Sequence, residues 1–319
     1  MSDHPATPPQ GPAAPPEGAA TPPEGLYALR LARDVIVGRG PEATSYLQGQ
    51  LSQDVGSLAD GASAWSWLLA PNGKVDALLR VTRLSAEEWL LDTDAGWGPA
   101  VAARLDRFKL RTRVEFALTD MAVIGLRGPG WEQLSESVTA LARVSPPWPA
   151  MTGVDLLGGD SAPPGVAEID PIGYEPVRIE AGLPRMGAEL DERTIPGETG
   201  LVGFTVSFTK GCYTGQELVA RIDSRGGNVA RRLRRLRLAP GPGPTAPSAA
   251  AASGSADPVG AGSELVTADG RPAGVITSVA APAAGEPVAL GYVRRGIDGS
   301  ETLLVAGSGI EVTQRELPF

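Results

Sequence analysis

Two proline-rich segments limit which parts of this 319-residue chain can form a folded core. Residues 1–24 contain eight prolines together with Ala, Gly and Glu, and residues 240–258 are rich in Pro, Ala, Gly and Ser. Such compositions bury too little apolar surface to offset the entropy lost on ordering. We therefore expect a disordered tail at 1–24, a folded body over 25–228, and a C-terminal module over 229–319 in which 240–258 is a long loop.

The body mixes strand and helix patterns without a regular strand–helix–strand repeat. This arrangement predicts an α+β fold rather than a doubly wound parallel sheet. Alternating apolar residues predict strands, and apolar residues at a spacing of three to four predict helices. The expected strands are 26–37, 65–69, 75–84, 88–91, 113–118 and 121–126, and the expected helices are 41–47, 99–108 and 131–142.

Short strand patterns fill the C-terminal module. Asp269-Gly270 between two of them is a strong hairpin signal. Even spacing of short strands is typical of small antiparallel barrels. We expect a β-barrel whose strands are 229–238, 263–267, 272–280, 287–293, 302–305 and 310–314.

Composition excludes several classes of chemistry. The single histidine is His4, in the proline-rich tail, so the folded body has none for a Ser-His-Asp triad, a Cys-His dyad or a histidine metal site. The net charge of −9 argues against a broad nucleic-acid surface. One cysteine excludes an internal disulfide, and no apolar run is long enough to span a membrane. We expect a cytoplasmic protein.

The lone cysteine lies in the segment Lys210-Gly211-Cys212-Tyr213-Thr214-Gly215-Gln216-Glu217, called the cysteine motif below. Residues 204–208 alternate like a strand, and Thr214 with Glu217 matches a capping box that would start a helix. A helix N-terminus and Lys210 would both favour the thiolate of Cys212. The competing interpretation is a small cysteine buried at a strand–turn–helix junction.

The cysteine motif, followed by Arg221, resembles the signature of the YgfZ folate-binding proteins. These are relatives of the glycine-cleavage T-protein and take part in iron–sulfur cluster assembly. Three further segments resemble the same family: Tyr46 to Asp54, Pro71 to Lys74, and Arg178 to Gly182. The resemblance covers roughly residues 27–315.

The resemblance implies two α+β domains and a C-terminal barrel around a site for tetrahydrofolate. It places Arg178 and Glu180 in the segment that contacts the pterin ring, where a carboxylate can accept two N–H bonds. Lys210 and Arg221 would meet the glutamate tail of the folate. Tyr213, Gln216 and Glu217 complete the expected folate-binding set, with solvated surface charge as the alternative for the charged members.

Three functional hypotheses follow. The first is a folate-binding accessory protein for iron–sulfur assembly or repair, in which Cys212 is a reactive thiol that acts with assembly or client proteins; it requires no catalysed reaction. The second is a folate-dependent aminomethyltransferase or demethylase with Asp76 and Glu180 as catalytic carboxylates. Ala77 stands where the T-protein has a second aspartate, which weakens it.

The third hypothesis is an RNA-modification accessory protein. It rests on the arginine run 231–237, which reads as a strand with a solvated face or as a docking patch for an acidic protein, RNA or polyglutamate.

Overall fold

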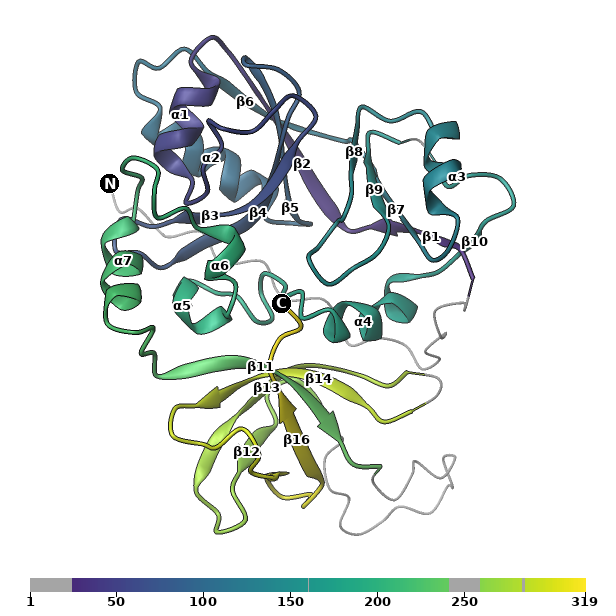
Figure 1. Ribbon diagram of the computed structural model, residues 1–319, viewed down its shortest axis with the longest axis vertical. Coiled ribbons are helices and arrows are strands. Elements are labelled where there is room, and N and C mark those ends of the chain that lie inside the picture. The colour runs from purple at the N-terminus through teal and green to yellow at the C-terminus, as the bar shows by residue number, and fades with distance from the viewer. Residues whose placement is uncertain (1–24, 160, 241–258, 283–284) are drawn as a thin grey trace, which may run out of the picture.

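The protein was analysed as a computed structural model, which describes residues 25–159, 161–240, 259–282 and 285–319. The predicted disorder of 1–24 and of 241–258 therefore falls outside the described residues. The rest forms two mixed sheet-and-helix units above a closed barrel (Figure 1). The predicted α+β class with a C-terminal antiparallel barrel is confirmed.

The first sheet has five antiparallel strands, and alternate residues of each strand face different cores. On strand β4 (Val75–Arg83), Leu79 and Val81 pack against two helices, while Leu78 joins the central core of the molecule. The strand order is β3 (Ser63–Leu69), β4 (Val75–Arg83), β5 (Glu88–Asp94), β2 (Arg33–Arg39) and β6 (Glu115–Thr119), and the covering helices are α1 (Ala43–Gln50) and α2 (Gly98–Phe108).

The second sheet shares a chain segment with the first, because the segment predicted as one strand forms two. The predicted strand 26–37 breaks at Ala32, so that β1 and β2 belong to different sheets and join them covalently. The order is β10 (Ala167–Glu168), β1 (Tyr27–Leu31), β7 (Val123–Arg127), β9 (Val154–Leu157) and β8 (Ala142–Val144). Helix α3 (Trp131–Ser137) packs on β7 and β9 and ends earlier than predicted, because Val138 is extended.

Buried charges connect the two sheets. The Arg80 guanidinium on β4 donates to Asp92 of β5 at 3.0 Å and to Asp155 of β9 at 2.7 Å. Arg127 of β7 donates to the other Asp155 oxygen at 2.6 Å. All four side chains are buried, so these bonds specify how the sheets face each other.

The C-terminal strands form a closed barrel, as predicted. Its strand order is β11 (Arg231–Leu238), β14 (Val288–Arg294), β13 (Pro272–Ala280), β12 (Glu264–Val266), β15 (Leu303–Val305) and β16 (Glu311–Arg315). Gly270 has a φ of 82° in the expected turn between β12 and β13. The last helix before the barrel ends at Ser224 and β11 begins at Arg231. The exact domain division at residue 229 stays a prediction.

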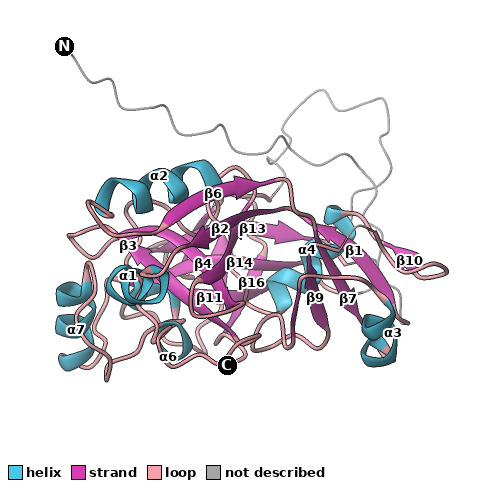
Figure 2. Cartoon of the chain, turned by 90° about the horizontal axis from the view of Figure 1, so that it is seen from above, coloured by secondary structure: helices cyan, strands magenta, loops and turns pink. Residues whose placement is uncertain are grey.

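Glu189 fastens the barrel to the body. Its buried carboxylate accepts bonds from Thr277 and Ser278 of β13, at 2.8 and 2.5 Å, and from the Arg178 guanidinium at 3.2 Å. Arg178 lies on α4 (Pro171–Glu180), which contacts β13 and β14 (Figures 1 and 2). Among the helices in the described ranges, none has the length and apolar character needed to cross a membrane.

We expect Asp155→Asn to destabilise the protein by about 3–5 kcal/mol at pH 7, because it leaves two buried guanidinium groups short of a counter-charge. Burial would raise the pKa of Asp155, but the charges of Arg127 and Arg80 outweigh it and hold the pKa below its usual value. The stabilisation is therefore complete above the usual carboxyl pKa and is lost as the pH falls through the lower pKa of the folded state.

Urea unfolding of both proteins at pH 7 and near pH 3 measures this, and the difference between them should shrink at the lower pH. Asp60→Asn is the matched control, because Asp60 pairs with Arg83 at the surface and its side chain is 64% exposed. Its effect should stay within about 1 kcal/mol. An equal loss for both variants would contradict the role assigned to Asp155.

Candidate functional site: the cysteine loop

Residues 206–215, called the cysteine loop below, connect two helices and contain the cysteine motif up to Gly215. The short helices α5 (Pro196–Thr199) and α6 (Val202–Thr205) precede it, and α7 (Gln216–Ser224) follows it. The predicted strand over 204–208 is wrong. Phe204 lies inside α6 and packs against the Trp148 and Phe319 rings, whereas Phe208 is 51% exposed. The two residues therefore do not share a sheet face.

The predicted capping box is also wrong. The N-cap of α7 is Gly215, with a φ of 81°, and no side chain caps the helix. The Gln216 side chain instead accepts the Tyr213 N–H at 3.1 Å. A Cβ on residue 215 would lie 2.6 Å from the Ala70 carbonyl oxygen, so the close approach of the β3–β4 turn requires glycine here.

Three segments that are distant in the sequence meet at the loop. The Thr214 N–H donates to the Gly49 carbonyl at 3.1 Å, and the Ser207 N–H donates to the Ser52 carbonyl at 2.9 Å. These two bonds tie both ends of the loop to the segment 46–54. The turn at Gly73 packs against the first turn of α7. Three of the four segments that resemble the YgfZ family therefore form one structural unit.

Lys210 fixes the centre of this unit. Its ammonium group donates to the carbonyl oxygens of Gln48, Leu51 and Gln53 at 2.6, 2.7 and 2.9 Å. An ammonium group has three donors, so all of them are engaged. Burial lowers the pKa of Lys210 to about 8. The expected pairing of Lys210 with the Cys212 thiolate is not observed, because the charge is directed into the protein.

Cys212 lies at the outer side of the anchored loop and is exposed. Gly211 beside it is exposed as well, and a Cβ there would meet no atom within 4 Å. The interpretation of Cys212 as a small buried side chain is therefore wrong. Within the described ranges, no three His, Cys, Asp or Glu side chains are grouped closely enough to hold a metal ion.

The remaining predicted residues of the motif take different positions. Tyr213 is buried beneath the loop, which raises its pKa to about 12, and its ring centroid lies 5.2 Å from the Lys210 Nζ atom. Gln216 is engaged with the backbone, as described above. Glu217 and Arg221 are exposed on α7. These two are the members of the predicted folate set with side chains open to solvent on this face.

Asp76 lies next to the same unit. Arg104 of α2 donates to its carboxylate at 2.9 Å, and also to the Gln50 side chain at 3.2 Å and the Leu69 carbonyl at 3.0 Å. Burial raises the pKa of Asp76, and the charge of Arg104 offsets this only in part. Asp76 is thus a partly buried carboxylate held near the segment 46–54.

Arg178 and Glu180 lie elsewhere, where α4 meets the barrel. Arg178 is buried and donates to Glu175 at 2.7 Å as well as to Glu189. Glu180 accepts from Arg237 at 2.6 Å and from Arg235 at 3.4 Å. The hydrogen bonds and ion pairs of the described residues do not join either side chain to the cysteine loop.

Sequence reasoning missed several groups that build the site. Ser52 and Gln53 donate to the α6 carbonyls of Thr205 and Phe204 at 2.7 and 2.8 Å. Their place in the family-like segment 46–54 was an available signal. Glu189 had none, because nothing in its neighbourhood in the sequence marks a carboxylate for burial.

A paired glycine substitution tests the geometry of the loop. We expect Gly215→Ala to destabilise the protein by more than about 1 kcal/mol, because residue 215 has a positive φ and no room for a Cβ. Gly211→Ala should be nearly neutral, since its Cβ would enter open space. Thermal unfolding of the two variants measures this, and equal melting temperatures would show that the turn at 70–74 does not press on the loop.

Comparison with known proteins finds relatives of the family that these segments resemble. No family model matches the chain. An uncharacterized protein of Haemophilus influenzae is 31% identical over 192 residues, covering 60% of this chain and 66% of that one. The tRNA-modifying protein YgfZ of Klebsiella pneumoniae is 30% identical over 218 residues, covering 59% and 64%.

A mitochondrial iron–sulfur cluster assembly factor IBA57 homolog of Mycosarcoma maydis is 28% identical over 217 residues, covering 61% and 53%. The matched region therefore spans less than two thirds of these relatives.

Among solved structures, the crystal structure of glycine cleavage system aminomethyltransferase T from Bartonella henselae superposes with a TM-score of 0.74 at 21% identity, over 92% of this chain and 86% of that one. This likeness shows the fold of the T-protein. Together with the named relatives and the assembled sequence segments, it leads to one conclusion: the chain is a relative of the YgfZ proteins.

Proposed function

We propose that this protein is an accessory factor in iron–sulfur cluster assembly or repair that presents the Cys212 thiol to a partner protein. The relative from Mycosarcoma maydis is named as an assembly factor for such clusters. The observation that carries the proposal is the contrast between an exposed thiol and the buried anchors that hold its loop.

The anchors make Cys212 a fixed group rather than a mobile one. Lys210 and Tyr213 flank it on either side and both reach into the protein, so the backbone between them has little freedom. A side chain held on a rigid support and directed outward is suited to meeting a second molecule in a defined orientation. A thiol used only for packing would be buried.

The chemistry of one thiol requires a partner. Iron–sulfur clusters are usually held by four cysteine ligands, and this chain has one cysteine. Cys212 would therefore supply one thiolate to a cluster, or to a cysteine, carried by another protein. In this proposal the cluster is cargo, and the client protein supplies the remaining ligands.

An aminomethyl transfer activity is the second candidate. Asp76 favours it, because it is a partly buried carboxylate with a raised pKa on a T-protein fold. Its ion pair with Arg104 and the alanine at position 77 argue against it. The two candidates need different residues, so they can be separated by mutation.

A role in RNA modification has support from relatives named as tRNA-modifying proteins. The arginine run 231–237, on which this hypothesis rests, offers fewer free charges in the structure than the sequence suggests. Arg231 pairs with Glu198, Arg234 with Glu316, and both Arg235 and Arg237 with Glu180. Most of the run therefore forms a seam of ion pairs within the protein.

Binding of tetrahydrofolate stays a prediction of the family resemblance, and its expected ring contacts do not fit this structure. Binding of a pterin ring needs a free carboxylate and an open cavity. Glu180 instead forms ion pairs with two arginines, and the cavity beside it measures about 10 Å³. Arg178 is buried and forms ion pairs with Glu175 and Glu189. The role proposed for Cys212 therefore uses no folate.

We expect Cys212→Ser to abolish complementation of a bacterial strain that lacks its YgfZ-family protein, while leaving the melting temperature within about 1 °C, because an exposed side chain adds little to stability. The activity of an iron–sulfur enzyme in that strain is the readout. Asp76→Asn should complement like the wild type. The opposite pattern would replace the thiol proposal with aminomethyl transfer.

Lys210→Met tests whether the rigid loop matters as well as the thiol. It keeps Cys212 but leaves three carbonyl groups without their donor, so amide hydrogen exchange of 48–53 and 207–214 should become faster and complementation should weaken. Lys109→Met is the control, because Lys109 only pairs with Asp106 at the surface.

We expect Glu180→Ala to lower the melting temperature without selectively changing the heat of tetrahydrofolate binding, because Glu180 holds the barrel arginines. Titration calorimetry and thermal unfolding of the same samples decide this. A variant with normal stability and lost folate binding would instead restore Glu180 as a ring contact.

A further inference from the structure

A second concave site lies on the barrel, and it is lined by arginines. A cavity of about 170 Å³ is bordered by Arg232, Arg234, Arg294 and Arg295, together with uncharged residues. Neither Cys212 nor any residue of the predicted folate set lines it. The cavity is therefore separate from the cysteine loop.

Antiparallel pairing brings the ends of two arginine-bearing strands together. Strands β11 and β14 run side by side, with Arg231 opposite Arg294 and Arg232 opposite Val293. The backbone N–H of Arg295 then donates to the Ala230 carbonyl at 2.9 Å, which keeps the strand ends together. The beginning of one basic segment and the end of another thus meet at one edge of the barrel.

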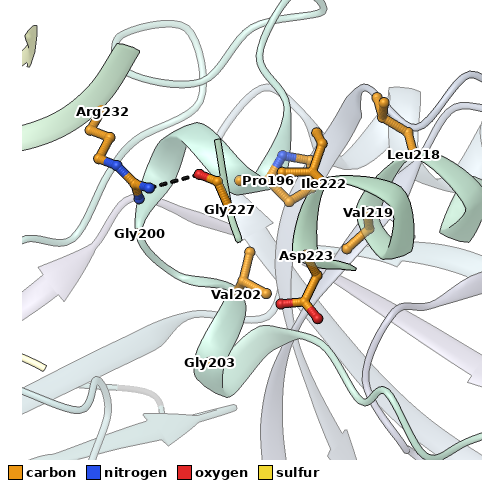
Figure 3. A pocket seen from close by; sticks show the side chains of 11 residues that line it. Pro196, Gly200, Val202, Gly203, Leu218, Val219, Ile222, Asp223, Gly227 and Arg232 are labelled. Atoms are coloured by element: carbon orange, nitrogen blue, oxygen red, sulfur yellow. Dashed lines mark hydrogen bonds between the residues drawn. The ribbon is translucent and has the colours of Figure 1, made fainter. Parts of the chain in front are cut away.

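The charges in this cavity are only partly balanced. Arg234 pairs with Glu316, whose side chain is 81% exposed. Arg232 also lines a neighbouring cavity of about 190 Å³ beside α5, α6 and α7, where it donates to the Gly227 carbonyl at 2.7 Å (Figure 3). Over the residues that the structure describes, Arg294 and Arg295 make no ion pair.

Four arginine residues border this hollow, and an anion bound there would balance the like charges of Arg294 and Arg295. The chain has a net charge of −9, so the cluster does not reflect a generally basic surface. Guanidinium groups present planar pairs of N–H donors that match phosphate oxygens, with bidentate geometry. All four cations here are arginines.

We propose that this cavity binds a phosphate group. Its volume suits a compact group, since pockets for larger organic ligands are usually about 300–1,000 Å³. A nucleic-acid backbone is typically met by a stripe of basic residues, whereas these arginines border one small hollow. The geometry therefore favours a small phosphorylated ligand over an RNA strand. The site is independent of the function proposed for Cys212.

Titration calorimetry with inorganic pyrophosphate in a phosphate-free buffer at low salt tests the site. The double variant Arg294→Gln/Arg295→Gln should bind pyrophosphate at least tenfold more weakly than the wild type. The control Arg113→Gln/Arg193→Gln removes the same charge at side chains that are 74% and 79% exposed elsewhere, and should stay within twofold. Thermal unfolding confirms that each variant is folded.

Two further probes identify the source of the phosphate. A single-stranded oligouridylate that binds more tightly than pyrophosphate, and is lost in the same double variant, would keep the phosphate site but assign it to RNA. Hexaglutamate that binds as tightly as pyrophosphate would overturn the phosphate assignment in favour of acidic peptides. Equal pyrophosphate binding by the wild type and the Arg294/Arg295 variant would overturn the site itself.

Discussion

The contact between Arg80 and Asp155 is the constraint on which the arrangement of the body depends. It joins strand β4 of one sheet to strand β9 of the other, and Asp92 and Arg127 complete its charge balance on either side. Buried charges cost much free energy unless each finds its partner, so alternative packings of the two sheets are disfavoured. Glu189 plays the same role between the body and the barrel.

Rigid sheets in turn allow a precise loop. The segment 46–54 and the turn at Gly73 are fixed by the first sheet, and they hold the cysteine motif through backbone bonds and the three bonds of Lys210. The loop holds its shape without regular structure, because the backbone N–H groups of Ser207, Lys210, Tyr213 and Thr214 each donate to an acceptor outside a helix or strand ladder. This explains how a short irregular segment can hold Cys212 outward in a defined position.

Local patterns predicted most of the fold. All six barrel strands, the hairpin at Asp269-Gly270, and the helices over 99–108 and near 43–50 followed from periodicity and turn residues, because these are local preferences. The break at Ala32, the helix α6 and the glycine cap of α7 did not follow. Each is imposed by a contact with a distant segment, such as Ala70 against Gly215, which no local pattern records.

By itself, the sequence predicted the α+β class, the barrel and the likeness to the YgfZ proteins, and it singled out the cysteine motif, because these depend on periodicity and on residues adjacent in the chain. Only the tertiary structure decided what the charged residues do. Lys210 turned inward to three carbonyls, Glu180 and Arg178 became anchors for the barrel, and Arg294 and Arg295 came to share one hollow. The physical reason is that the partner of a charge is chosen by proximity in space, and the sequence separation of these partners ranges from a few residues to more than 150.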